Sequence, residues 1–346
     1  MILERLANDV VIGDGGVVFE LERRGYVSAG PFTPVVVVEH PEALRQLQVD
    51  FARAGAEVLQ AYTYYAHEEK LKVSDMGGAV SAINAVATQI AKEVADEYNC
   101  IVAGNICNTW VYEPGDPTSH KETRRQFDTQ IEHQLPHGAD FFIAETLQYL
   151  GEAEIALRAI HDAGAPAMIT LGLAYGDRTA DDVGLEEAAK RLEDAGAEII
   201  GLNCFRDPSH MLPLLGRMRE AASCHIAAQP VAFRCTDERP YFQAQQWQDG
   251  PAFPLSLDPF YLTRAEMADY ALRAREMGIR FIGSCCGSAP HHVRAMAEAL
   301  GRTTPNTKFS PRLDLHPIMG DESHRRERDQ RILDEQRGED IDWRSP

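Results

Sequence analysis

The sequence predicts an α/β protein of the (βα)8 class, a TIM barrel, with a long insertion after the seventh strand and a C-terminal arm. Short apolar runs rich in β-branched residues alternate with amphipathic stretches along the whole chain, as in parallel sheets built from βα units. Eight such runs are present, and the 346 residues exceed the ~250 typical of a barrel, which leaves room for insertions. An open, doubly wound sheet is the alternative.

The predicted elements follow one another in the order that a barrel requires. The strands are expected at Val10–Asp14, Val58–Tyr62, Ile101–Ile106, Ala139–Glu145, Pro166–Leu173, Glu198–Cys204, Ile226–Phe233 and Arg280–Cys286. Helices with apolar residues at helical spacing are expected at Pro41–Ala54, Ala82–Glu97, Lys121–Leu135, Leu185–Ala195 and Arg264–Met277. Several of these stretches stop at a glycine, the residue that most often follows a helix C-terminus: Gly55, Gly138, Gly196 and Gly278.

The length beyond a minimal barrel is concentrated in two places. Residues 234–262, rich in Pro, Gln and aromatic residues, form the insertion after the seventh strand. From about residue 321 the tail is dominated by Arg, Glu and Asp, which indicates either an arm packed on another subunit or a solvated end. We therefore divide the chain into a barrel domain, 1–302, and a C-terminal arm, 303–346, and expect a homo-oligomer.

Composition narrows the class of protein. Apolar residues make up 44% of the chain and charged residues 25%, enough to bury a large core. A formal charge of −19 argues against binding to nucleic acid or to anionic membranes. The first residues lack the apolar core of a signal peptide, no stretch is long enough to span a membrane, and the seven cysteines lack the density of a disulfide framework. A cytoplasmic protein with reduced thiols is expected.

Residues suited to chemistry fall at the predicted strand ends. The active sites of TIM barrels lie at the C-terminal ends of the strands. The residues at or just past the ends of strands 1, 2, 4, 6 and 8 are Asp14, Tyr64, Tyr65, Glu145, Cys204, Cys285 and Cys286. These side chains are therefore expected to meet at one mouth of the barrel.

Three of the cysteines predict a metal site. Cys285 and Cys286 stand between Gly283 and Gly287, where a loop would let both sulfurs face one ion. With Cys204 they offer three thiolates and leave one position open, as in catalytic zinc sites. Zinc bound there would accept a substrate thiol and lower its pKa.

The remaining four cysteines, Cys100, Cys107, Cys224 and Cys235, are interpreted as small buried hydrophobic residues. No phosphate-binding, flavin or nicotinamide motif is convincing, so zinc, one ion per chain, is the only cofactor predicted.

Five stretches together resemble the homocysteine S-methyltransferases. They are IGDGG at 12–16, GAEVLQAYTYY at 55–65, IAE at 143–145, IGLNC at 200–204 and GSCCG at 283–287. The resemblance covers about residues 8–316 and is greatest to the members that use betaine as methyl donor. It implies a zinc-bearing barrel with Cys204, Cys285 and Cys286 as ligands.

The resemblance also implies the substrate contacts. Asp14 and Glu145 would bind the ammonium group of homocysteine, and Phe32, Tyr64 and Tyr65 would hold the donor's onium group by cation–π attraction. His316 would contact the donor's carboxylate. Without the resemblance, Asp14 is typical of a turn or N-cap, the tyrosines of ordinary packing and His316 of a surface tail. Glu145 follows a very apolar run, where a carboxylate without a partner is costly.

The implied activity is methyl transfer from an onium donor to the thiol of L-homocysteine, giving methionine, by in-line displacement at the methyl carbon. Glycine betaine is favoured as donor. The sequence departs from the betaine-dependent pattern at Phe32 (tryptophan there), Thr146 (tyrosine), Ser284 (glycine) and in a shorter tail after residue 316. Dimethylsulfoniopropionate, S-methylmethionine or another betaine therefore remain open as donors, and a non-catalytic zinc- or thiol-binding barrel is the alternative of another class.

Overall fold

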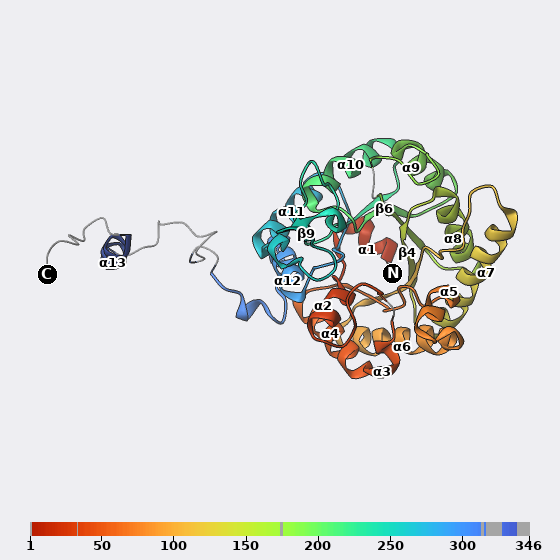
Figure 1. Cartoon of the computed structure of the whole chain (residues 1–346), viewed down its shortest axis with the longest axis horizontal. Helices are drawn as coiled ribbons and strands as arrows, with labels where there is room; N and C mark the ends of the chain where they lie inside the picture. Colours follow the sequence, from red (N-terminus) through yellow and green to blue (C-terminus); the bar gives the residue numbers. More distant parts are fainter. Residues whose placement is uncertain (1, 33, 174–175, 313–314, 316–326, 338–346) are drawn as a thin grey trace. The chain divides into compact units, whose positions relative to one another are not determined.

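The computed structural model describes residues 2–32, 34–173, 176–312, 315 and 327–337. Eight parallel strands form one sheet in the order β1-β10-β7-β6-β5-β4-β3-β2, and helices surround them (Figure 1). At the remaining seam, the Glu57 backbone N–H, just before β2, donates to the Ile12 carbonyl of β1 over 2.8 Å. The strands thus follow a ring in chain order, which confirms the TIM barrel and excludes the open doubly wound sheet.

The strands are β1 (Val11–Ile12), β2 (Val58–Gln60), β3 (Ile101–Cys107), β4 (Phe141–Leu147), β5 (Ala167–Leu171), β6 (Ile199–Asn203), β7 (His225–Gln229) and β10 (Phe281–Ile282). All eight were predicted, but β7 ends four residues earlier than expected. Pro230 follows Gln229 and has no N–H with which to continue the ladder. β10 also stops early, so Cys285 and Cys286 lie in a loop, as expected.

The five predicted helices are α4 (Pro41–Ala54), α6 (Val80–Tyr98), α7 (Pro117–Gln134), α9 (Leu185–Asp194) and α11 (Arg264–Glu276). The start of α7 is fixed by Asp116, whose side chain accepts from the backbone N–H of Thr118 and Ser119, with Pro117 in the first turn. Thr263 and Glu266 form a capping box at the start of α11. The glycines expected at helix ends all have positive φ: Gly55, Gly138, Gly196 and Gly278.

The other described α-helices are α1 (Ile2–Asn8), α2 (Val17–Arg23), α3 (Val36–Glu39), α5 (Glu68–Leu71), α8 (Leu150–Asp162), α10 (Pro208–Ala221), α12 (Pro290–Ala299) and α13 (Glu327–Arg337). The 3-10 turns are η1 (Lys72–Ser74), η2 (Gly77–Ala79), η3 (Leu135–His137), η4 (Phe242–Ala244), η5 (Asp258–Phe260) and η6 (Thr307–Phe309). None of the described helices is long and apolar enough to cross a membrane.

Helix α1 closes one end of the barrel. Figure 1 shows it inside the ring of strands. Its Ile2 and Leu6 are buried in a cluster with side chains from all eight strands: Val11, Val58, Ile101, Ala103, Phe141, Ile143, Met168, Ile199, Ala227 and Phe281. With this apolar plug at the N-terminal ends of the strands, the polar residues farther along the strands are reached from the opposite end.

The insertion between β7 and α11 lies at that opposite end. It contains η4, a hairpin of β8 (Gln246–Trp247) and β9 (Gly250–Pro251), and η5. Phe242 and Leu257 of the insertion are buried in one cluster with Phe19 of α2 and with Cys204. The insertion therefore forms part of the surroundings of the cysteines. The chain divides into two compact units, Met1–Thr307 and Lys308–Pro346, and α13 belongs to the second.

Candidate metal centre and substrate cavity

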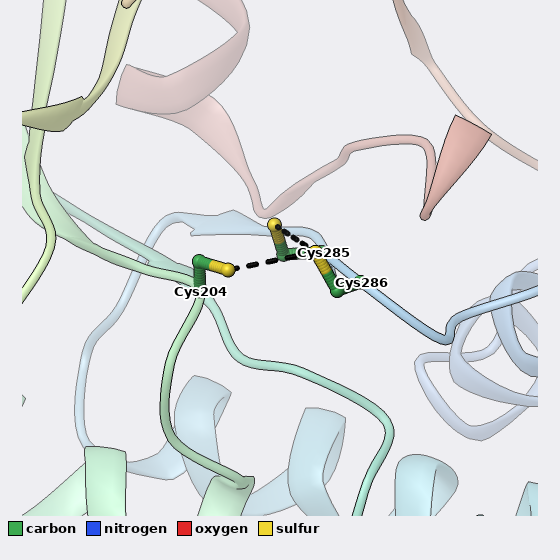
Figure 2. A group of neighbouring side chains, drawn as sticks. All are labelled: Cys204, Cys285 and Cys286. Carbon is green, nitrogen blue, oxygen red and sulfur yellow. Dashed lines mark hydrogen bonds between the residues drawn. The ribbon is translucent and has the colours of Figure 1, made fainter. Parts of the chain in front are cut away.

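The structure brings the three predicted sulfur atoms together. Cys204 Sγ lies 3.5 Å from Cys286 Sγ, and Cys286 Sγ lies 3.8 Å from Cys285 Sγ (Figure 2). All three atoms lie within 4.8 Å of one another. Two sulfurs on a tetrahedral zinc with Zn–S bonds of about 2.3 Å are about 3.8 Å apart, so this trio fits such an ion. Cys204 comes from the end of β6 and the pair from the loop after β10.

The backbone holds both cysteine segments against residues 229–232, which continue β7. The Cys204 N–H donates to the Gln229 carbonyl over 2.9 Å, and the Cys285 N–H donates to the Pro230 carbonyl over 2.8 Å. Cys204 itself has φ +58°, a left-handed conformation that is costly for a residue other than glycine and that is common at functional sites. It turns the chain at the end of β6.

Gly287, directly after the pair, completes this geometry. It has φ +81°, and a Cβ atom there would lie 2.5 Å from the Phe233 ring. Only glycine therefore allows the chain to leave the pair along this path.

The thiols act on one another electrostatically. Hydrogen bonds from the thiols of Cys285 and then Cys286 lower the pKa of Cys204 well below its ordinary value, although burial opposes this. The pKa values of Cys285 and Cys286 are raised, chiefly because Cys204 holds the charge. Without a cation, one thiolate is favoured and three are not, so three ionised sulfurs at this spacing require a metal ion.

A cavity of about 230 Å³ adjoins the cysteines. Its walls include every predicted site residue within the described part of the chain: Asp14, Phe32, Tyr64, Tyr65, Glu145, Cys204, Cys285 and Cys286. His316 lies outside the described residues. Among the described residues that line the cavity there is no Lys, Arg or His. The cavity therefore presents carboxyl groups, thiols, amides and aromatic rings to a ligand.

Glu145, in β4, is held by amide side chains from three other strands, β2, β3 and β6. Its Oε1 accepts from Gln60 Nε2 (2.6 Å) and Asn105 Nδ2 (2.7 Å), and its Oε2 accepts from Asn203 Nδ2 (3.0 Å). Burial, and next the charge on Cys285, raise the pKa of Glu145 to about 8. The position of the carboxyl is fixed, but no Lys, Arg or His among the described residues of the cavity wall is there to stabilise its ionised form.

Asp14 is buried in the same wall. Its Oδ2 accepts from the Gln60 backbone N–H over 2.8 Å, and burial raises its pKa to about 7. A ligand that carries an ammonium group would stabilise the ionised forms of both carboxyls.

The aromatic side chains occur on several elements. The Tyr64 and Tyr65 rings stand 4.2 Å apart between centroids, and Phe32 lies 6.0 Å from Phe19. Phe205 and Phe242 also line the cavity. These rings offer several π faces to a cationic ligand.

Two departures from the betaine-dependent pattern have structural partners. The Thr146 hydroxyl accepts from Asn203 Nδ2 over 2.7 Å, and the Thr146 backbone N–H donates to Asn203 Oδ1, also over 2.7 Å. The Ser284 hydroxyl donates to the Ser288 hydroxyl over 2.5 Å. Both side chains also line the cavity.

Several residues that line the cavity or hold Glu145 were missed by the sequence analysis. The amides Gln60, Asn105 and Asn203 each lie within or at the end of an apolar strand, a pattern that could have indicated them. Phe19 and Phe242 had no such signal. They belong to a helix and to the insertion, and only the fold brings them to the cavity.

Comparison with known proteins identifies the class to which this barrel and its thiol site belong. The family model for homocysteine S-methyltransferases matches residues 11–300, and the chain belongs to this family. Members transfer a methyl group from a donor to homocysteine, and the chain is a homocysteine S-methyltransferase.

The relatives that it matches divide by donor. It is 41% identical to betaine–homocysteine S-methyltransferase 1 of Danio rerio over 309 residues, which cover 86% of this chain and 75% of the relative. It is 40% identical to the S-methylmethionine–homocysteine S-methyltransferase of Mus musculus over 320 residues, which cover 90% of this chain and 83% of the relative. The metallated homocysteine methyltransferase of Escherichia coli shares the fold, with a TM-score of 0.68 and 20% identity over 84% of this chain and 96% of that one.

Proposed function

We propose that the chain transfers a methyl group from an onium donor, with glycine betaine favoured, to the thiol of L-homocysteine in a zinc-dependent reaction that gives methionine. The observation that carries the proposal is the cavity in which three neighbouring sulfurs adjoin two buried carboxyl groups. Cys204, Cys285 and Cys286 would hold one zinc ion per chain. Zinc bound there would supply the Lewis acidity that lowers the pKa of a substrate thiol.

The carboxyl groups orient the acceptor in this proposal. Asp14 and Glu145 would pair with the ammonium group of homocysteine, and the three amides around Glu145 keep its carboxylate in one position. Such a fixed anchor aims the sulfur at the methyl carbon, and alignment of this kind can contribute about 7 kcal/mol or more to a displacement. The sulfur–methyl bond forms as the methyl–nitrogen bond breaks, and the electron pair stays on the departing amine.

The donor would lie against the aromatic part of the wall. Phe32, Tyr64 and Tyr65 present π faces that attract a methylated cation. Betaine is the donor named for the fish relative and S-methylmethionine for the mouse relative. Dimethylsulfoniopropionate or another betaine would fit the same chemistry.

We also propose a role for His316 at the donor's carboxylate, a cytoplasmic homo-oligomer, and a division of the chain into the barrel, 1–302, and an arm, 303–346, that contacts another subunit.

Metal analysis tests the zinc site. Cys204→Ser, Cys285→Ser and Cys286→Ser should each lose stoichiometric zinc by atomic absorption. Cys224→Ser is the matched control, because this cysteine precedes β7 at the opposite end of the barrel and should leave zinc at one ion per chain. Full zinc in all three cysteine variants would reject the site.

A labelled-methyl assay tests the reaction. Isotope from glycine betaine should appear in methionine only when homocysteine and zinc are present, and a panel with the two sulfonium donors would rank the donors. Absence of transfer from every onium donor by the zinc-loaded protein would favour a non-catalytic zinc-binding barrel instead.

A further inference from the structure

One hydroxyl group in the cavity wall has no hydrogen-bond partner among the described residues. Tyr62 lies two residues past β2, and only 3% of its surface is exposed. Its hydroxyl oxygen is fully buried without a partner, and the residue lines the same cavity as the cysteines. Buried hydroxyls nearly always have a partner, since an unpaired one costs about 1–3 kcal/mol. A ligand in the cavity is the natural partner here.

The neighbours of Tyr62 connect it with the predicted donor contact, Phe32. Burial, and next the negative charges of Glu22 and Cys286, raise the pKa of Tyr62, so both groups lie within electrostatic reach of its oxygen. The Glu22 carboxyl accepts from the Gly30 backbone N–H over 3.3 Å, which ties α2 to the segment that carries Phe32. Phe32 is the predicted donor contact, and Tyr62 lines the same cavity as Phe32 and Cys286.

The onium donors considered for this protein also carry a carboxylate. Among the described residues of the cavity wall there is no cationic side chain to receive it. A neutral hydrogen-bond donor can bind this carboxylate in addition to the proposed contact with His316, and a hydrogen bond to a carboxylate contributes more than one between neutral groups. The Tyr62 hydroxyl is such a donor, and it needs no rearrangement of protein hydrogen bonds to act.

We propose that the Tyr62 hydroxyl donates a hydrogen bond to the carboxylate of the methyl donor and makes the cavity selective for zwitterionic onium compounds. This inference rests on the proposed methyl transfer. It assigns to Tyr62 a role in specificity that its position in a packed strand end does not by itself indicate.

Two pairs of donors that differ mainly in the carboxylate arm test this role in the zinc-loaded enzyme. Glycine betaine is compared with tetramethylammonium, and dimethylsulfoniopropionate with trimethylsulfonium. Tyr62→Phe should lower kcat/KM about 10- to 100-fold for the two carboxylate donors, as expected for loss of a hydrogen bond to a charged group. The carboxylate-free donors should change less than about threefold, and KM for homocysteine should stay constant. Tyr98→Phe, which removes a phenol hydroxyl at the end of α6, is the matched control.

Other outcomes would overturn the inference. An equal loss with both members of a pair, no loss with the carboxylate donors, or a rise confined to KM for homocysteine would each do so. The ligand-free variant should melt at or above the wild-type temperature, since phenylalanine keeps the ring and removes an unpaired hydroxyl. A lower melting temperature with unchanged donor preference would make Tyr62 a structural residue.

Binding separates this inference from the proposed function. If none of the tested donors supports methylation of homocysteine by the wild-type enzyme, the proposed function fails. Calorimetric titration with glycine betaine then decides on Tyr62, because equal affinity of wild type and variant, or no binding to either, rejects its role.

Discussion

The folded protein should lose stability as pH rises through the range in which Glu152 ionises. Glu152, in the first turn of α8, is 2% exposed, and its Oε1 accepts from the Thr109 backbone N–H (2.7 Å) and hydroxyl (2.8 Å). Burial raises its pKa from 4.5 to about 7, although both bonds from Thr109 oppose the shift. A group whose pKa is raised on folding stabilises the protein below the unfolded pKa, and this contribution is lost as pH rises to the folded pKa.

The magnitude follows from the shift. A rise of about 2.5 pKa units corresponds to about 3 kcal/mol, and the positive end of the α8 dipole, which favours the carboxylate, reduces this by up to about 1 kcal/mol. Glu152→Gln keeps an acceptor for Thr109 and cannot ionise. Its free energy of unfolding relative to wild type should therefore increase by about 2 kcal/mol between pH 5 and pH 8.

Urea denaturation at several pH values measures this difference. Glu187→Gln, at an exposed position on α9, serves as the control. Its free energy of unfolding should differ from the wild-type value by the same amount at every pH from 5 to 8. A Glu152→Gln difference that is constant from pH 5 to pH 8 would refute the reasoning, since it would mean that Glu152 ionises equally easily in the folded and unfolded chains.

Two further substitutions test the site and the barrel. Asn105→Leu removes the 2.7 Å hydrogen bond to Glu145. Steady-state kinetics should show KM for homocysteine rising about 10- to 100-fold. An unchanged KM would mean that Glu145 does not bind the acceptor. Gly201→Ala should prevent folding by circular dichroism, because its Cβ would lie 2.1 Å from the Ala227 carbonyl oxygen inside the sheet. Gly216→Ala in α10 meets only the end of the Met277 side chain, at 3.3 Å, and should fold normally.

The regular part of the fold could be predicted because local chemistry determines it. Pro41 and Gly55 delimit α4, and the predicted bounds agree with those in the structure. Strand ends were less accurate. β1 and β10 have only two residues each. The residues after them that were expected to continue these strands lie in turns set by Gly13, Gly283 and contacts with neighbouring strands. The helix α1 was not predicted, because its apolar residues gain their stability inside the barrel and not from a helical repeat of useful length.

The site was predictable where function requires an unusual residue type. Adjacent cysteines and an acidic residue after an apolar run are visible in the sequence, and the structure places Cys285, Cys286 and Glu145 around one cavity. The amides that hold Glu145 are common residues, so only their convergence from β2, β3 and β6 distinguishes them. The unpaired state of the Tyr62 hydroxyl is likewise a property of three-dimensional packing.

The enclosure around the donor cannot be inferred from single positions. Thr146 gives less aromatic surface than the tyrosine of betaine-dependent relatives, yet the space beside it is not empty. A Cβ atom at Gly172 would lie 2.7 Å from the Phe205 ring and 3.1 Å from the Thr146 methyl group, so Phe205 packs next to Thr146.

Phe242 likewise supplies aromatic surface close to Phe32. It comes from the insertion, lies 6.0 Å from Phe19, and Phe19 is equally close to Phe32. Aromatic surface that is lost at one position is thus supplied from segments that sequence comparison at that position does not register. Donor preference follows from the combined surface of these rings and the polar groups between them, and only a panel of donors measures that combination.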